Sequence, residues 1–182
     1  MDLEHLTEDL RNDREIVSMG LCRSGLSVLA FVGNEIRPFA EAYCRVWRNP
    51  MDLEHLTEDL RNDREIVLTA VNKNGNALQY ASEALGNDRE IVLDAVINNS
   101  RAYEFVSELL KNDREFILAA VSQNYHGLLY ASEALRNDRE IVLAAVSRSG
   151  NALQYASEAL RNDPEIIAEA ERNRRPTIED VD

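Results

Sequence analysis

The sequence predicts an all-α fold: a right-handed α-α superhelix, or solenoid, of about seven 25-residue two-helix repeats, with about 14 short helices. Two observations predict it. The tetrad Asn-Asp-Arg-Glu begins at Asn12, recurs every 25 residues from Asn62 to Asn137, and returns as Asn-Asp-Pro-Glu at Asn162. Between the tetrads, apolar residues recur at helical spacing. A repeat of this kind is typical of solenoids, in which each unit is stabilised by its neighbours.

The period divides the chain into one continuous repeat array over residues 1–175 and a polar tail at 176–182. The unit 26–50 diverges from the others because it lacks the tetrad and carries the only Trp. The units begin at residues 1, 26, 51, 76, 101, 126 and 151.

The first 17 residues recur unchanged at residues 51–67. We call residues that are 25 positions apart members of one slot. Within the second copy, Asp59 occupies a slot that we interpret as facing inward, and a polar residue there is typical of a terminal unit. We therefore hypothesise that residues 1–50 arose by a later duplication, and we expect a fragment of residues 51–182 to melt about as cooperatively as the whole chain. Later units fill the same slot with Ala84, Leu109, Ala134 and Ala159.

The unit 76–100 illustrates the two expected helices. Its first half predicts a one-sided amphipathic helix over 77–85, with Leu78, Ala81 and Leu85 on the apolar stripe. Its second half, 91–97, is apolar around more than half of its circumference, so neighbouring units must cover it.

The tetrad lies where the second helix begins. Either Asn87 or Asp88 is expected to accept hydrogen bonds from the first free amides of that helix. With Asn87 as the cap, Glu90 would complete a capping box. Pro164 replaces Arg89 in the last unit, which is compatible with a first helical turn.

The repeat consensus NDREIVLAAVSxNGxALxYASEALR resembles a family of short tandem helical repeats catalogued as domain of unknown function number 4116. The resemblance covers residues 51–173 and 1–17 well and residues 18–50 poorly. It implies an interaction or architectural role and brings no catalytic residues with it.

The cysteines and two of the histidines are expected to be structural. Cys22 and Cys44 lie among apolar neighbours, which is typical of small buried side chains. His5 and His55 occupy an aromatic slot, so we interpret them as partly buried packing residues. No converging His and Cys ligands are visible, and we expect no metal ion and no cofactor. The aromatic residues of that slot are Tyr80, Phe105, Tyr130 and Tyr155.

One slot just outside the apolar stripe holds a carboxylate in nearly every unit. Stacked units would place these carboxylates about 10 Å apart along one face. Two interpretations stay open: a strip that binds a basic peptide or protein, or a solvated face whose carboxylates pair with basic residues three positions later. The strip comprises Glu58, Glu83, Glu108, Glu133 and Glu158, the same slot also holds Glu8, and the basic residues are Arg11, Arg61, Lys111, Arg136 and Arg161.

Charge and hydropathy restrict the partners. The formal net charge of −13 repels phosphate backbones and anionic headgroups, so we expect neither a nucleic acid nor a membrane as partner. The sequence shows no apolar run of the ~18 residues that span a bilayer, and its first residues do not form a signal peptide. We therefore expect an intracellular, cytoplasmic protein.

A non-catalytic scaffold that mediates protein–protein interaction is the first functional interpretation, with a protein or peptide as partner and a basic one favoured. The alternative is a passive structural spacer within a larger protein or assembly. We expect no enzyme, because the paired acids recur in unit after unit whereas a catalytic pair occurs once. An RNA-reading repeat is disfavoured by the charge. Slots that vary between units and are expected to be exposed favour the scaffold: Gln79, Glu104, Leu129 and Gln154.

Overall fold

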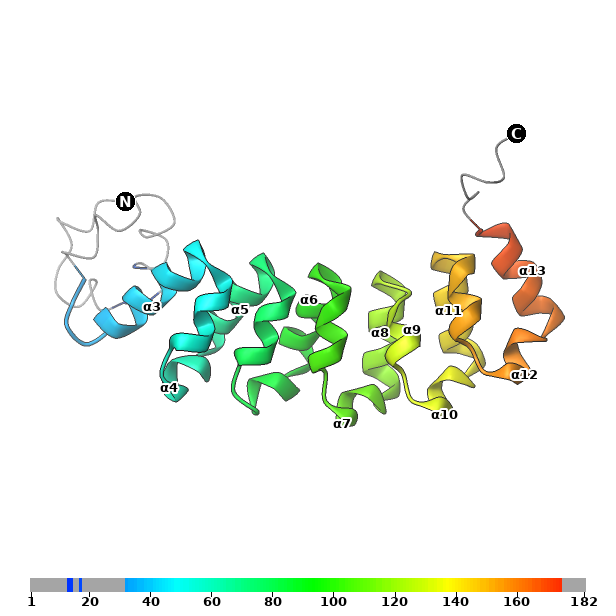
Figure 1. Ribbon diagram of the computed structural model, residues 1–182, viewed down its shortest axis with the longest axis horizontal. Coiled ribbons are helices and arrows are strands. Elements are labelled where there is room, and N and C mark those ends of the chain that lie inside the picture. Colours follow the sequence, from blue (N-terminus) through cyan, green and yellow to red (C-terminus); the bar gives the residue numbers. More distant parts are fainter. Residues whose placement is uncertain (1–12, 15–16, 18–31, 175–182) are drawn as a thin grey trace, which may run out of the picture.

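The computed structural model describes residues 13–14, 17 and 32–174. All regular secondary structure in these residues is helical, and it recurs with the 25-residue period of the sequence. Long helices stand side by side along the array, each packed against the next (Figure 1). The predicted all-α solenoid is confirmed. The long helices are α3 (Arg37–Arg48), α5 (Arg64–Lys73), α6 (Arg89–Asn98), α8 (Arg114–Gln123), α11 (Arg139–Arg148) and α13 (Pro164–Arg172).

Two shorter helices connect each long helix to the next. The first is a 3-10 helix of six residues, or the α-helix α9 (Gly127–Tyr130) in the unit 126–150. The 3-10 helices are η3 (Pro50–His55), η4 (Gly75–Tyr80), η6 (Ser100–Phe105) and η7 (Gly150–Tyr155). The second connecting helices are α4 (Glu58–Arg61), η5 (Leu85–Asn87), α7 (Glu108–Lys111), α10 (Glu133–Arg136) and α12 (Glu158–Arg161).

The single helix expected over 77–85 is therefore divided into η4 and η5. In the next unit Val106 and Ser107 both adopt extended backbone, which separates η6 from α7. The break is stabilised from outside the unit: the Ser82 amide donates to the carbonyl of Arg61, one unit earlier, at 3.0 Å. A hydrogen bond between units thus replaces one within a helix. The spacing of apolar residues in the sequence does not indicate where such a break occurs.

The core runs along the array between successive long helices. Four positions on each internal long helix are buried, at i, i+1, i+4 and i+5. In α6 these are Ile91, Val92, Ala95 and Val96, all with no exposed surface. The last described helix, α13, keeps Ile166 and Ala170 buried and exposes Glu171 where inner units have Val. Each long helix is thus covered on several sides, as its apolar sequence predicts.

The divergent unit 26–50 still contributes a long helix in register. Helix α3 packs against α5 and buries Phe39, Ala42 and Val46. Cys44 is buried, as expected, whereas Cys22 lies outside the described residues.

The interpretation of the Asp59 slot as inward-facing is wrong. Asp59 and its equivalents Ala84, Ala134 and Ala159 are exposed, and Leu109 in this slot is 72% exposed. The extended break before each second connecting helix is the reason, because the apolar stripe does not continue in register across it. The observation that motivated a duplication of residues 1–50 therefore no longer supports it.

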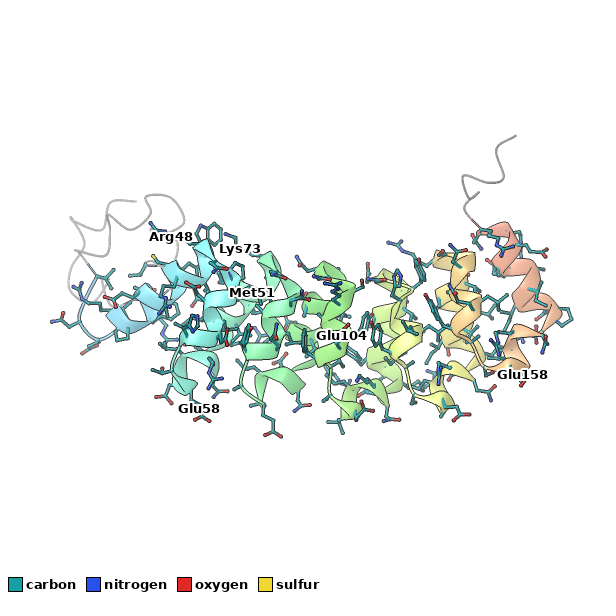
Figure 2. The ribbon with its side chains drawn as sticks, viewed as in Figure 1. Arg48, Met51, Glu58, Lys73, Glu104 and Glu158 are labelled. Carbon is teal, nitrogen blue, oxygen red and sulfur yellow. The ribbon has the colours of Figure 1, made fainter. Side chains whose placement is uncertain are left out.

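The long helices run in one direction and give the array two different edges. Their N-termini and the second connecting helices share one edge, where Glu58 and Glu158 lie, whereas Arg48 and Lys73 lie toward the opposite edge (Figure 2). None of the helices in the described part of the chain combines the length and apolar content that crossing a membrane requires.

Candidate functional site

The tetrad's Asp is the N-cap of every long helix except α3, whose N-cap Ile36 makes no side-chain cap hydrogen bond. The side chain of Asp88 accepts hydrogen bonds from the amides of Glu90 and Ile91 at 3.0 and 3.1 Å. The structure therefore selects Asp88 over Asn87 as the cap, and the capping box expected for Asn87 and Glu90 does not form. The same role belongs to Asp63, Asp113, Asp138 and Asp163.

The tetrad's Arg binds the following unit. The Nε of Arg114 donates to Asp138 at 2.8 Å, and its guanidinium also pairs with Glu140. The hydrogen bond from Arg114 is the main cause that lowers the pKa of Asp138 below its ordinary value. Each Arg thus joins the cap and the first turn of the next long helix. We call this pair of contacts, from one Arg to the Asp and Glu of the next unit's tetrad, an Arg clamp. Equivalent Arg clamps link Arg64 to Asp88 and Glu90, Arg89 to Asp113 and Glu115, and Arg139 to Asp163 and Glu165.

Sequence reasoning missed these clamps, although a signal was present. Arg fills this slot in every unit except two: the last unit has Pro164, and the divergent unit has Phe39. Phe39 cannot pair with Asp63. Arg14 forms the missing ion pair instead. Its guanidinium carbon lies over the Phe39 ring, 4.5 Å from the ring centroid, and its guanidinium pairs with Asp63, 49 residues away.

The tetrad's Asn closes the preceding short helix. The side-chain amide of Asn112 donates a hydrogen bond to the backbone carbonyl of Glu108 at 2.8 Å. The side-chain oxygen of Asn62 accepts from the Ser82 hydroxyl of the next unit at 2.6 Å, and Asn137 accepts from Ser157 in the same way. The four recurring polar residues are thus occupied by capping and by stacking of units.

The predicted acidic strip lies on the edge formed by the second connecting helices. All five carboxylates are exposed. Four of them begin those helices, and Glu83 lies two residues before η5. Within the described residues, only Glu108 has an ion-pair partner, Lys111 at 2.8 Å. Pairing with the basic residues three positions later is therefore realised at one described position, and Arg11 lies outside the described residues. Glu58, Glu83, Glu133 and Glu158 present free carboxylates.

The variable slots belong to the first connecting helices, and in the unit 76–100 Gln79 lines the same hollow as Glu83 of the strip. Gln79, Glu104, Leu129 and Gln154 are all exposed, as predicted. Apolar side chains are exposed there too: Phe105 by 36% and Leu129 by 42%. The exposed surface of the connecting helices therefore combines carboxylates with apolar groups that differ from unit to unit.

The histidines do not form a metal centre in the described part of the chain, where no group of three or more His, Cys, Asp or Glu side chains is placed to hold a metal ion. His5 lies outside the described residues, and His55 is exposed, so its interpretation as a partly buried packing residue is wrong. His126 stacks on Tyr125 with ring centroids 4.2 Å apart, and its amide donates to the side chain of Asn124.

Comparison with known proteins gives a family match. The family described as "Domain of unknown function (DUF4116)" matches residues 48–85, 88–136 and 138–182, more than half of the chain. No curated protein and no solved structure matches the chain significantly. The matched segments cover the units from residue 51 onward apart from Gly86, Asn87 and Asn137, and they leave out the divergent unit except for its last residues.

Proposed function

Because the chain belongs to the DUF4116 family, whose description states no activity, we propose from its geometry that it is a non-catalytic scaffold that binds a basic segment of another protein. One observation carries the proposal. Variable and acidic side chains both lie exposed on and beside the connecting helices, whereas the recurring tetrads are occupied by stacking of units. Gln79, Glu83 and Phe105 border one hollow there.

Electrostatics supports a basic partner. The chain carries a net charge of −13, and a row of unpaired carboxylates attracts a cationic segment at long range. The exposed apolar side chains add contact area, which charge alone does not supply. We expect binding to weaken with added salt, since the Debye length falls from about 10 Å at 0.1 M to about 3 Å at 1 M.

The test compares two charge-matched variants as baits in a native lysate. The strip variant carries Glu58→Gln, Glu83→Gln, Glu133→Gln and Glu158→Gln. The control carries four substitutions elsewhere: Glu35→Gln, Glu41→Gln, Asp94→Asn and Glu171→Gln. None of the replaced side chains makes an ion pair among the described residues.

The proposal expects a stoichiometric partner that the unmodified chain and the control retain and the strip variant loses. Equal retention by the strip variant would overturn the assignment to this surface of the array. Failure of the unmodified chain to retain any partner would favour the passive spacer instead.

A further inference from the structure

The junction between the units 76–100 and 101–125 has a hollow at Gly86. A Cβ placed on Gly86 would meet no heavy atom within 4 Å, and its backbone is not in the left-handed region. A cavity of about 270 Å³ opens at this position. Other units have a basic residue in this slot: Arg61, Lys111, Arg136 and Arg161. The cavity is lined by Leu78, Ala81, Glu83, Gly86, Phe105 and Ser107 among others.

In the three other described units that have a basic residue here and are followed by a further unit, that residue is partly buried. The side chain of Lys111 is only 19% exposed. The Nε atoms of Arg61 and Arg136 are buried. Arg161, which no following unit covers among the described residues, is exposed instead. At the junctions that follow Arg61, Lys111 and Arg136, a long basic side chain is therefore partly buried between successive units.

The backbone is also more open at this junction. The Ser132 amide donates to Lys111 at 3.1 Å, and the Ser157 amide donates to Arg136 at 2.9 Å. Among the described residues, no equivalent bond joins Ser107 to Gly86. The second connecting helix here is the three-residue η5, because Gly is a poor helix former by about 1 kcal/mol relative to Ala.

We propose that the hollow at Gly86 binds an arginine side chain from an extended segment of the partner protein, which takes the place of the basic residue that the other units supply themselves. Leu78 and Ala81 contact the aliphatic stem. Phe105 offers a ring face to a planar guanidinium. Glu83, whose carboxylate has no ion pair in the described residues, completes a charge-assisted hydrogen bond. The cavity lies just below the ~300–1,000 Å³ of pockets for whole small molecules, which suits one side chain.

This inference rests on the proposed scaffold function and names the chemistry that one position recognises. Its test uses the full chain and two substitutions at the same residue. Gly86→Arg restores the residue type of the other units and fills the hollow. Gly86→Ala removes the flexible glycine and leaves the hollow open. Both should raise the melting temperature, so that a loss of binding does not reflect unfolding.

The probe is acetyl-Ala-Arg-Ala-amide, and the control probe replaces arginine with citrulline, which has nearly the same shape and no charge. In NMR titrations we expect saturable shifts of the Glu83, Gly86 and Ser107 amides, with a dissociation constant on the order of 1 mM. The citrulline peptide should bind about tenfold more weakly. Gly86→Ala should retain binding of the arginine peptide, and Gly86→Arg should abolish it.

The peptide titrations would overturn the inference in three ways: no shift at these amides, equal binding of both peptides, or unchanged binding of the arginine peptide to Gly86→Arg. A fourth outcome distinguishes failure of the arginine site from failure of the proposed scaffold function. A protein partner that the Gly86→Arg variant retains and the strip variant loses would end the inference and leave the proposed function intact.

Discussion

The hydroxyl of Tyr103 occupies the space that a side chain at position 127 would need. A Cβ on Gly127 would lie 2.6 Å from this hydroxyl. Tyr103 stacks on Tyr130 with ring centroids 5.0 Å apart, and burial raises the pKa of its phenol. Other units have Leu and Ala at the two positions, as in Leu78 and Ala102. A larger residue in one unit is thus accommodated by a smaller one in the next.

This relationship predicts that the two positions are energetically coupled. Gly127→Ala should overpack the junction at a cost of about 1–3 kcal/mol, partly offset by better helix propensity in α9. Tyr103→Leu with Gly127→Ala restores the Leu and Ala of other units and should relieve the clash. Urea unfolding of the four proteins in the cycle should give a coupling energy of about 1 kcal/mol or more. Additive effects would show that the contact is not constrained.

A second prediction compares one substitution at two glycines. A Cβ on Gly75 would lie 2.1 Å from the carbonyl oxygen of Ala95, whereas one on Gly86 meets nothing within 4 Å. Gly75→Ala must push apart the backbones of two units and should destabilise the array by about 1–3 kcal/mol. Gly86→Ala should stabilise it by about 0.5–1 kcal/mol. Chemical denaturation of both variants measures the difference, and effects of the same sign would contradict the close approach at Gly75.

The structural features that could be predicted from the sequence are those that depend on the spacing of residues within one unit. The apolar face of α6 and the position of its first turn follow from Ile91, Val92 and the tetrad before them. The pairing of Arg114 with Asp138 was not predicted, because it depends on how one unit lies against the next. The exposed Asp59 slot was misassigned because an extended break shifts the register of the helix that follows.

The same limit applies to the candidate site. The exposure of Gln79 and Leu129 could be predicted from their place beside the apolar stripe. The hollow at Gly86 could not, because an absent side chain creates space only where the neighbouring unit leaves it open. The sequence nevertheless indicates that this position is unusual. Glycine occurs there once, whereas the other tetrad-bearing units have Arg or Lys.

The Arg clamps predict how stability depends on pH. Hydrogen bonds from Arg114 and Arg139 lower the pKa of Asp138 and Asp163, and for Asp113 the Phe116 amide is the largest cause. A carboxyl group whose pKa is lower in the folded state stabilises the protein above its unfolded pKa of about 3.9. That stability is lost as the pH falls through the folded pKa. We therefore expect the free energy of unfolding to decrease progressively below about pH 5.

Asp138→Asn tests this dependence while it retains a good N-cap residue. At neutral pH the cost should be small, about 1 kcal/mol or less, because Arg114 is half exposed. The decrease in stability toward acid should be shallower than in the unmodified chain. Glu133→Gln, which removes an exposed carboxylate without an ion pair, is the control for loss of charge alone. An acid dependence that is identical in all three proteins would show that the clamp does not contribute.

The last prediction concerns α3 and revises what the sequence led us to expect of a shortened chain. The fragment 51–182 was expected to melt about as cooperatively as the whole, but it lacks α3, which packs against α5 and η3. Its removal would expose Leu53, which is fully buried in the chain, and each large apolar side chain so exposed costs about 1.5–3 kcal/mol. The fragment 32–182 keeps α3. Thermal unfolding should therefore show a clearly lower melting temperature for 51–182 than for 32–182, and equal melting temperatures would mean that α3 does not stabilise the first described junction.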